Sequence, residues 1–521
     1  MTSTRPGFEP PETPDAPERP RPTPEPRTTG RVAGIASGIL GLGIAELIAA
    51  LLKGPSPLLA LGDRVIDLTP RPVKDAVIGA VGGADKQLLL AIVAIVTLAL
   101  LGLAGTLARK RVAYGVGLLV VLGVIGVAAL FGRSNGNVAG SVFGLVVGVM
   151  VGIVGLVWLT RTTTPENVAP DGFDRRRFLL AASSMAALGV AGGVGAKVID
   201  GRRHPMAKVT IPRPVSPAAP IPAGTELRID GLSPYITPVE DFYRVDIALA
   251  VPGIDPSTWK LKIHGLVDKP LTLTYRDLID MPLYERRVTI CCVSNPVAGP
   301  YIGNTTWTGV RLRDVLAKVG VKQSADAVLS KGADGITIGT PVEALTDGRD
   351  ALLAVAMDGR PLTPEHGFPV RMVVPGLYGY VSATKWLTDL ELTRFDRFSA
   401  YWTERGWSAQ GPIKTECRID LPMQDTDHGE VTVAGVAWAQ HRGIEKVEVR
   451  VDDGEWHQAT LGTEDGIDTW RQWRWTWDAH PGHHTIEARA YDRSGTPQTS
   501  QVADVAPDGA TGYPRVDITV H

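Results

Sequence analysis

The stretch Arg287-Val-Thr-Ile-Cys-Cys-Val-Ser-Asn295 carries the strongest structural signal in this chain. Its β-branched residues are typical of a strand, which runs into two adjacent cysteines and a short polar turn. A basic, glycine-containing segment follows later, from Pro364 to Gly376 and on to Lys385. A single thiolate together with donors for a large anion is the combination expected around a metal that an anionic cofactor carries.

The chain contains three cysteines, Cys291, Cys292 and Cys417. Two of them are adjacent, so they cannot build the disulfide framework of a small secreted domain. A buried cysteine is most often a small apolar core residue. Successive side chains of a strand point to opposite faces, so Cys291 and Cys292 are expected to have different surroundings.

Length and charge limit the class of protein. With 521 residues, the chain is long enough for about three domains. Its formal net charge of -2 argues against a nucleic-acid partner, because such partners are bound through basic surfaces. We therefore expect a multidomain protein that binds no nucleic acid.

Residues 1–30 are crowded with Pro, Glu, Arg and Thr and are predicted to form a disordered tail. Residues 31–200 are predicted to form an all-α bundle of about five transmembrane helices. Glu46 is the only charged residue in the first four apolar runs, which argues against buried helices of a soluble protein. Recurrent glycines favour close packing of the helices. The five apolar runs are 32–52, 88–108, 112–131, 138–159 and 178–196.

Lys and Arg are unevenly distributed among the segments that connect the spans, and by the positive-inside rule this distribution predicts which segments lie in the cytoplasm. Basic residues gather before the first span, at 109–111 and from Arg161 to Arg177. These segments are predicted to be cytoplasmic, the N-terminal tail included. The 53–87 segment, the 132–137 turn and everything after residue 200 are then predicted to lie outside the cytoplasm, in a multi-pass protein of the cell membrane.

The fifth run begins with Asp174-Arg-Arg-Arg-Phe-Leu-Leu180, which is similar to a twin-arginine export signal. Asp174 stands where that signal usually has Ser or Thr. The alternative is an ordinary basic flank of a membrane span, and cleavage after the run also stays open.

Two features of the spans bear on electron and proton transfer. All ten histidines lie at or beyond His204, so the spans lack the axial ligands of a b-type haem, and we expect no haem in this chain. Glu46 allows two interpretations, a structural role or a proton or quinol site.

Residues 201–228 are rich in Pro and Ala and are predicted to form an extended linker. Between 229 and 400 the chain mixes strand patterns such as Trp259–Gly265 with short helical patterns such as Tyr275–Asp280 and Val310–Lys318. Because the patterns do not follow a regular βαβ repeat, an α+β fold is predicted.

Segments in the C-terminal half resemble the sulfite oxidase family of molybdopterin enzymes, and the resemblance covers about residues 230–521. It is carried by Thr237–Arg244, Cys292–Asn295, Trp307–Leu316 and Leu352–Trp386. The resemblance implies a molybdopterin-binding catalytic domain in which the Cys292 thiolate binds molybdenum at the catalytic centre. By the same resemblance, the cofactor-binding residues are Phe242, Tyr243, Arg244, His366, Arg371, Thr384 and Lys385.

The residue types in these segments suit such a cofactor. Molybdopterin offers a dithiolene to the metal and a phosphate to the protein, so the site needs a soft ligand and donors for oxygen anions. Arg371 lies within the apolar run Val370–Val374, where an unpaired charge would be costly, and an anion is therefore expected beside it. Gly376 and Gly379 either admit the ligand close to the backbone or are simple turn residues.

The chain also departs from the sulfite-oxidising members of the family. They carry a Tyr-Val-Arg-Asn order where this chain reads Tyr243-Arg-Val-Asp246, and arginines after the cysteine turn where it has Pro296 and Val297. One step along a strand reverses the direction of a side chain. Their substrate tyrosine falls near Glu404. These changes weaken the attraction for a dianion such as sulfite, unless Arg405 supplies a cation instead.

Residues 410–521 alternate apolar and polar residues between turns, which is typical of a β-sandwich. This stretch resembles the immunoglobulin-like dimerisation domain of the family, and the resemblance implies a homodimer. The tryptophans from Trp470 to Trp477 allow a carbohydrate-binding platform, but packing in a core or interface is the commoner use.

These features predict a membrane-anchored, extracytoplasmic molybdopterin oxidoreductase that carries out two-electron oxo transfer on a small molecule, with sulfur compounds as candidates. Without a haem domain, electrons have to pass through a separate carrier, a cytochrome or a quinol-linked partner. Two alternatives stay open. The same site could reduce S- or N-oxides, or the chain could be a membrane-tethered scaffold without a cofactor.

Overall fold

The computed structural model describes residues 26–70, 73, 85–131, 137–161, 175–203 and 209–521. The chain forms two compact units: Met1–Ala49, Leu88–Val127 and Val142–Gly195 make up the first, and Ala50–Gln87, Ala128–Ser141 and Ala196–His521 make up the second. Several sequence predictions fall outside the described residues in part. They concern the tail as far as residue 25, residues 71–72 and 74–84 of the 53–87 segment, the turn at 132–136, the basic segment at 162–174 with Asp174 of the export-signal pattern, and residues 204–208 of the linker.

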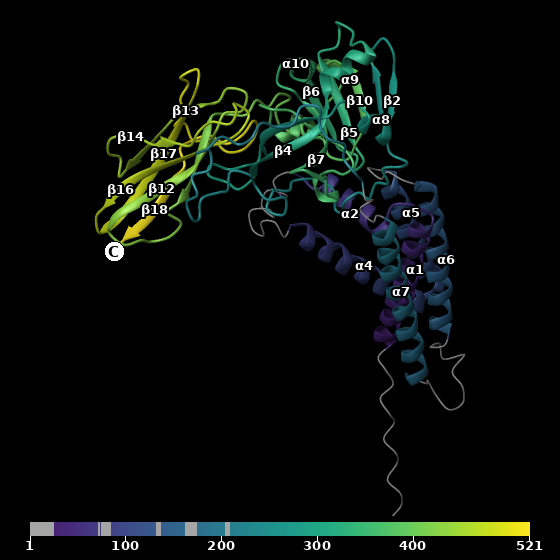
Figure 1. The fold of residues 1–521 in the computed structure, drawn as a ribbon. Helices are drawn as coiled ribbons and strands as arrows, with labels where there is room; N and C mark the ends of the chain where they lie inside the picture. Colours follow the sequence, from purple (N-terminus) through teal and green to yellow (C-terminus); the bar gives the residue numbers. More distant parts are fainter. Residues whose placement is uncertain (1–25, 71–72, 74–84, 132–136, 162–174, 204–208) are drawn as a thin grey trace, which may run out of the picture. The chain divides into compact units, whose positions relative to one another are not determined.

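The first unit is built from apolar helices (Figure 1). Among the described residues, five helices are long and apolar enough to cross a membrane, as the sequence predicts. Residues 26–30, assigned to the disordered tail from the sequence, are helical instead, and Pro26 is compatible with the first helical turn. The five helices are α1 (Pro26–Leu51), α4 (Asp85–Lys110), α5 (Val112–Leu130), α6 (Val138–Arg161) and α7 (Arg175–Arg203).

Glycines let α1 approach three other helices closely. A Cβ added to Gly34 would lie 2.1 Å from the carbonyl oxygen of Leu101 in α4, and one added to Gly41 would lie 2.4 Å from that of Gly148 in α6. At Gly43 the backbone of α7 is equally close. The absence of a side chain at these positions therefore sets the spacing of the helices.

The second unit includes a short helix, α2 (Pro57–Leu68), which lies in the sequence between the first two spans. Ser56 caps it, because its hydroxyl accepts a hydrogen bond from the N–H of Leu59 at 3.2 Å. Close to the end of α2, the Asp67 carboxylate accepts a hydrogen bond from Arg405 at 3.1 Å. This contact fixes α2 to the C-terminal half of the chain.

Strands and short helices between residues 260 and 405 confirm the predicted α+β arrangement. The strands are β1 (Lys260–Gly265), β2 (Leu271–Thr274), β3 (Tyr284–Cys291), β4 (Ile302–Arg311), β5 (Ala327–Gly332), β6 (Thr337–Pro341), β7 (Leu352–Met357), β8 (Arg360–Pro361), β9 (Arg371–Val373) and β10 (Leu387–Thr393). The helices are α8 (Tyr275–Ile279), α9 (Leu312–Val319) and α10 (Val342–Thr346), with 3-10 turns η3 (Pro364–His366), η4 (Gly379–Val381), η5 (Phe395–Arg397) and η6 (Thr403–Arg405).

These strands form two five-stranded sheets. One has the order β2-β1-β10-β5-β6, and the other has the order β3-β4-β7-β8 with β9 paired to β7. Every residue of β7 is buried, as expected for a central strand covered on both faces. β3, which leads into the cysteine pair, is held along its full length by antiparallel pairing with β4.

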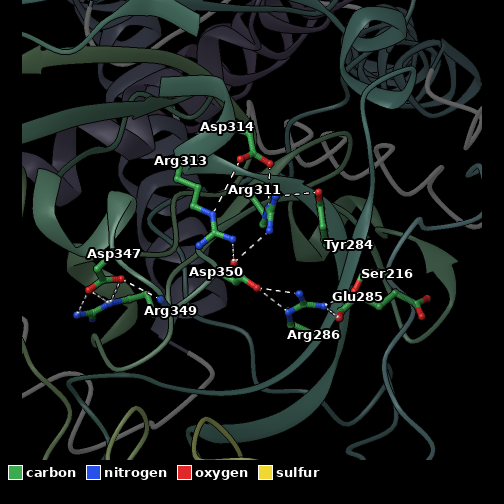
Figure 2. Close-up of polar contacts among 10 residues, drawn as sticks. All are labelled: Ser216, Tyr284, Glu285, Arg286, Arg311, Arg313, Asp314, Asp347, Arg349 and Asp350. Carbon is green, nitrogen blue, oxygen red and sulfur yellow. Dashed lines mark hydrogen bonds and ion pairs between the residues drawn. The ribbon is translucent and has the colours of Figure 1, made fainter. Parts of the chain in front are cut away.

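A cluster of ion pairs, which we call the Asp350 cluster, fixes β3 to its surroundings (Figure 2). The Asp350 carboxylate lies 2.8 Å from Nη2 of Arg286 on β3 and 3.1 Å from Nη2 of Arg313 on α9. Nη1 of Arg311, at the end of β4, lies 3.9 Å from the same carboxylate, and the Arg311 guanidinium lies over the ring of Tyr284. One carboxylate thus connects two strands and a helix.

Two four-stranded antiparallel sheets that share one core follow, as predicted for a β-sandwich. Trp470 and Trp473 are buried, which favours packing over a carbohydrate platform for these two residues. One sheet consists of β11 (Glu416–Leu421), β12 (Gly429–Trp438), β16 (Arg471–Ala479) and β15 (Thr460–Leu461). The other consists of β14 (His457–Gln458), β13 (Ile444–Val451), β17 (Gly482–Asp492) and β18 (Arg515–Val520).

The outer strand β3 is also bound by the sandwich region. The N–H of Thr289 donates to the carbonyl of Asp468 at 2.9 Å, and Gln440 donates to the carbonyl of Thr289 at 3.0 Å. On the same strand, the N–H of Glu285 donates to the carbonyl of Ser216 at 2.9 Å. Residues 201–203 of the predicted linker are helical instead, because they end α7, and residues 209–228 are attached to the folded body.

Candidate active site

Cys292 is the first residue after β3, and its backbone is fixed on both sides. Its N–H donates to the carbonyl of Tyr301 at 2.9 Å, and its own carbonyl accepts from the N–H of Asn295 at 3.1 Å. The Asn295 side chain closes the turn by accepting from the N–H of Tyr301 at 2.8 Å. The residue is 9% exposed, and its thiol lies 2.9 Å from the hydroxyl of Ser294.

The two adjacent cysteines have different surroundings. Cys291 is completely buried in the main core, whereas Cys292 lines a cavity. Burial raises the pKa of both thiols, and the hydrogen bond from Ser294 opposes this effect at Cys292. Only the second thiol can therefore meet a ligand in the cavity.

The cavity contains about 870 Å³ of empty space, its open mouth included. Its lining combines a polar group of side chains with an apolar and aromatic group. The polar side chains are Asp246, Cys292, Ser294, Asp334, His366, Arg371 and Lys385. The apolar and aromatic side chains include Tyr243, Val245, Ile247, Ile290, Val293, Ile336, Ile338, Tyr380, Trp386, Trp402 and Trp407.

Arg371, on β9, is a buried cation with unsatisfied hydrogen-bonding capacity. Its Nη1 donates to the carbonyl of His366 at 3.3 Å, and its guanidinium lies 4.9 Å from the ring centre of Trp307. Its Nε has no hydrogen-bond partner among the described residues. Burial lowers the pKa of Arg371 to about 10, which still leaves it charged at neutral pH. An anion in the cavity would satisfy both the charge and the donor.

His366, in η3, is neutral at physiological pH. Burial and then the charge of Arg371 lower its pKa to about 4. Its Nε2 lies 3.0 Å from the carbonyl of Val239 and therefore carries the proton, because a carbonyl only accepts. Nδ1 is then an acceptor, so His366 can hold an N–H or O–H group of a ligand.

Lys385 is a second buried cation at the cavity. Its Nζ donates to Asp246 at 2.8 Å and to the carbonyl of Glu365 at 3.2 Å. Burial lowers its pKa to about 8, although the Asp246 charge acts in the opposite direction. Arg244 also donates to Asp246, at 2.8 Å, but its side chain is 38% exposed and does not line the cavity.

The remaining predicted cofactor residues differ in their positions. Tyr243 lines the cavity, and burial raises its pKa well above the ordinary value. Phe242 lies behind it, stacked at 5.5 Å and edge-on to His366 at 5.8 Å. Thr384 is completely buried with its hydroxyl 2.6 Å from that of Ser330. Phe242 and Thr384 therefore support the wall rather than line it.

Asp334 is a polar wall residue that the sequence did not reveal. It follows β5 in a Gly332-Ala-Asp-Gly335 turn that reads as ordinary turn chemistry, and its carboxylate accepts from the N–H of Ile336 at 3.2 Å. Burial, together with the charge of Asp246, raises its pKa to about 6. Only the long-range pairing of β5 with β10 brings it to the cavity.

Arg244, Glu404 and Arg405, whose contact with substrate the sequence leaves open, do not line the cavity. The side chain of Glu404 is 60% exposed, and that of Arg405 is bound to Asp67 and stacked over Tyr401 at 3.5 Å. Neither they nor Arg244 line the cavity. The neighbouring Trp402 and Trp407 do so instead.

The donor set fits a pterin-bound molybdenum. Among the described residues, no group of three or more His, Cys, Asp or Glu side chains could hold a metal ion, and Cys292 offers a metal one soft ligand. Arg371 and Lys385 are suited to phosphate oxygens. The carboxylates of Asp246 and Asp334 are acceptors for the N–H groups of a heterocycle.

Comparison with known proteins gives the same picture. The oxidoreductase molybdopterin binding domain family matches residues 248–402. An uncharacterized oxidoreductase, YuiH of Bacillus subtilis (strain 168), is 38% identical over 157 residues, which cover 30% of this chain and 76% of YuiH. Mitochondrial sulfite oxidase of Homo sapiens is 31% identical over 324 residues, which cover 53% of this chain and 58% of that protein.

The chain thus spans a little over half the length of the mammalian sulfite oxidases that it matches. Among solved structures, the sulfane dehydrogenase SoxCD from Paracoccus pantotrophus superposes with a TM-score of 0.46 at 24% identity. That superposition covers 51% of this chain and 75% of the other.

Proposed function

Because the chain belongs to the sulfite oxidase family of molybdopterin oxidoreductases, we propose that it is a membrane-anchored enzyme that transfers oxygen to or from a small molecule at a molybdenum centre. One observation carries the proposal: the Cys292 thiol and the buried Arg371, whose Nε lacks a partner among the described residues, line the same cavity. Cys292 offers a soft ligand to the metal, and Arg371 offers a positive charge and a hydrogen-bond donor to an anionic group of the cofactor.

In the mechanism that we propose, the bound cofactor supplies the two-electron redox change and exchanges the oxygen atom. The chain supplies binding and orientation. Cys292 would be the protein ligand of molybdenum, Arg371 and Lys385 would hold the phosphate, and His366 would accept a hydrogen bond through Nδ1. The apolar wall that includes Trp402 and Trp407 would limit the access of water to the reacting atoms.

The substrate and the electron partner are also part of the proposal. The named activity of the mitochondrial sulfite oxidases suggests a sulfur compound for this chain. Reduction of S- or N-oxides at the same site is the second candidate, and the lining of the cavity by Val245 and two tryptophans favours it over oxidation of a dianion. Electrons would be exchanged with a separate cytochrome or quinol-linked carrier, and a homodimer through the immunoglobulin-like sandwich is expected.

Contacts within each unit support the proposed extracytoplasmic placement. The Asp67–Arg405 contact would put α2 and the catalytic region on one side of a membrane. At the other end of the first span, Arg109 donates to Thr29 at 2.5 Å, so the N-terminal end of α1 and the C-terminal end of α4 lie on one side. Both relations agree with the orientation that the positive-inside rule gives.

Substitution of each cysteine tests the metal ligand. The full wild-type chain, produced in a host that makes molybdopterin, should contain molybdenum. The Cys292→Ser variant should lose the oxidoreductase activity and the cysteine–molybdenum X-ray absorption signal. Cys291→Ser is the matched control, because that thiol does not line the cavity, and should keep both. Equal losses in the two variants would contradict the ligand assignment, and wild-type protein without molybdenum would favour the scaffold alternative.

A further inference from the structure

Ser294 is a polar residue of the cavity wall that the proposed mechanism does not use. Its hydroxyl lies 2.9 Å from the Cys292 sulfur, and both side chains line the cavity. An inference drawn from this contact rests on the proposed function, because it concerns the ligand that Cys292 would give to molybdenum. The contact places a hydrogen-bonding group directly beside the only atom through which the chain would bind the metal.

The turn after β3 is closed without the Ser294 hydroxyl. The N–H of Asn295 donates to the carbonyl of Cys292 at 3.1 Å, and the N–H of Cys292 donates to the carbonyl of Tyr301 at 2.9 Å. The side-chain oxygen of Asn295 accepts from the N–H of Tyr301 at 2.8 Å. These bonds hold the backbone on both sides of the cysteine, so the turn does not require the hydroxyl, and the contact with sulfur has to be explained in another way.

Metal binding would fix the direction of this hydrogen bond. Without a metal, either the thiol or the hydroxyl can donate. A metal-bound thiolate has no proton and can only accept, so the hydroxyl then has to donate. Cys292 is buried and Ser294 is partly buried, so water competes little for the sulfur and the bond is stronger than it would be in solvent.

A hydrogen bond to a ligand sulfur affects the two oxidation states of a metal unequally. Reduction adds negative charge to the metal and its ligands, and the positive end of an O–H dipole directed at the sulfur stabilises that charge. Hydrogen bonds to ligand sulfurs are among the features by which proteins set the potentials of metal–thiolate centres. The reduction potential is therefore higher with such a bond than without it.

We infer that Ser294 is a positioning residue, which donates a hydrogen bond to the Cys292 thiolate and thereby raises the reduction potential of the molybdenum centre. Ser294 acts through Cys292 and not on the substrate. This role requires a hydroxyl at residue 294, which threonine also supplies and which alanine and glycine lack.

The potential of molybdenum-loaded full-length protein tests this role. A redox titration followed by electron paramagnetic resonance measures the Mo(VI)/Mo(V) couple. Ser294→Ala should shift this equilibrium toward the oxidised state by about tenfold, because a hydrogen bond to a charged sulfur is lost, and a tenfold shift corresponds to about 59 mV for one electron. Ser294→Gly, a second variant without the hydroxyl, should reproduce the shift, and Ser294→Thr should restore the wild-type potential.

The absorption band for charge transfer from sulfur to molybdenum gives a second readout that does not depend on turnover. A hydrogen bond lowers the energy of the sulfur lone pairs, so its loss should move this band to longer wavelength in Ser294→Ala and Ser294→Gly. The band of Ser294→Thr should remain at the wild-type position.

The matched control is Ser382→Ala, which also removes a hydroxyl from the folded body. The Ser382 hydroxyl is buried, donates to the carbonyls of Leu377 at 3.1 Å and Tyr378 at 2.9 Å, and does not line the cavity. Its loss should leave both the potential and the charge-transfer band unchanged.

The outcomes distinguish this inference from the proposed function. An unchanged potential in loaded Ser294→Ala and Ser294→Gly would overturn the role of Ser294 and leave the molybdenum site intact. An equal shift in Ser382→Ala would also overturn it, because the effect would then not come from the bond to sulfur. Wild-type protein that contains no molybdenum would contradict the proposed function itself, and this inference with it.

Discussion

Arg371 is a buried cation whose hydrogen-bonding capacity the described residues satisfy only in part. It is 5% exposed, its Nη1 donates to the carbonyl of His366, and its Nε lacks a partner among the described residues. A buried cation that is only partly satisfied lowers the stability of the cofactor-free fold. Such a residue is explained by ligand binding rather than by stability.

Arg371→Met should therefore have opposite effects on cofactor content and on stability. The loaded protein should lose molybdenum, measured by metal analysis, because a phosphate anchor is gone. Cofactor-free protein from a host that does not make molybdopterin should become more stable, by roughly 1–3 kcal/mol, and unfold at higher temperature.

The matched control is Arg349→Met. Arg349 is bound to Asp347 at 2.8 Å outside the cavity, so its loss leaves a carboxylate without this partner and should lower stability without lowering the molybdenum content. If both variants lost stability to the same extent, Arg371 would be an ordinary structural residue and the argument from its unsatisfied donor would fail.

Asp334 predicts a pH dependence of the cofactor-free protein. Its pKa is raised from 3.8 to about 6, so above pH 6 the folded state bears the cost of a buried carboxylate that the unfolded chain does not bear. The cost declines as pH falls through 6 and vanishes below 3.8. Relative to Asp334→Asn, the wild type should thus gain up to roughly 3 kcal/mol between about pH 7.5 and about pH 4.

Thermal unfolding of both proteins across this pH range, followed by tryptophan fluorescence, measures the difference. A constant difference in stability between wild type and Asp334→Asn would mean that the carboxyl is not buried in a charged form.

The sequence did not reveal Asp334, because its turn is locally unremarkable and its environment is created by β5–β10 pairing. Cys292, by contrast, is marked by a strand pattern and a neighbouring turn in one short stretch.

At the scale of elements, local sequence patterns predicted that a helix or strand exists better than they predicted where it begins and ends. The helix expected over Val310–Lys318 is α9, Leu312–Val319, because Val310 and Arg311 pair with β7 and end β4. The spacing of apolar residues indicates a helix in this region, but the pairing of β4 with β7 decides at which residue the helix begins. The five apolar helices were predictable since their length and composition need no tertiary partner.

The Asp350 cluster gives a prediction at this scale. Asp350 is the shared partner of Arg286 on β3 and Arg313 on α9, and Asp350→Asn keeps a residue that tolerates its left-handed backbone (φ 51°) while removing the charge. We expect a loss of about 1–3 kcal/mol in the free energy of unfolding, because three arginines lose a partly buried partner.

Asp396→Asn is the control for this prediction, since Asp396 pairs with Arg394 at 2.9 Å on an exposed turn. Its unfolding temperature should not differ measurably from that of the wild type. A similar loss in both variants would show that the location of Asp350 between two strands and a helix gives it no special weight.

At the scale of the whole molecule, the sequence carries no signal for how the parts of the second unit are joined. The segment predicted as a linker is held by hydrogen bonds such as Val215 N–H to the Leu283 carbonyl at 2.8 Å, and Trp470 donates to the carbonyl of Tyr235 at 2.9 Å. Such contacts connect residues far apart in sequence, so composition alone gives no signal for them. They make β3, and hence Cys292, part of one continuous body.

The orientation in the membrane can be tested in a Cys292→Ser background, because that thiol lines the open cavity whereas Cys291 and Cys417 are buried. Val502 is 85% exposed and Arg111 is exposed between the second and third spans. In intact cells, a membrane-impermeant maleimide should label Val502→Cys but label Arg111→Cys only after permeabilisation, because the positive-inside rule keeps the basic connection in the cytoplasm. The reverse pattern would put the catalytic region in the cytoplasm and exclude an extracytoplasmic enzyme.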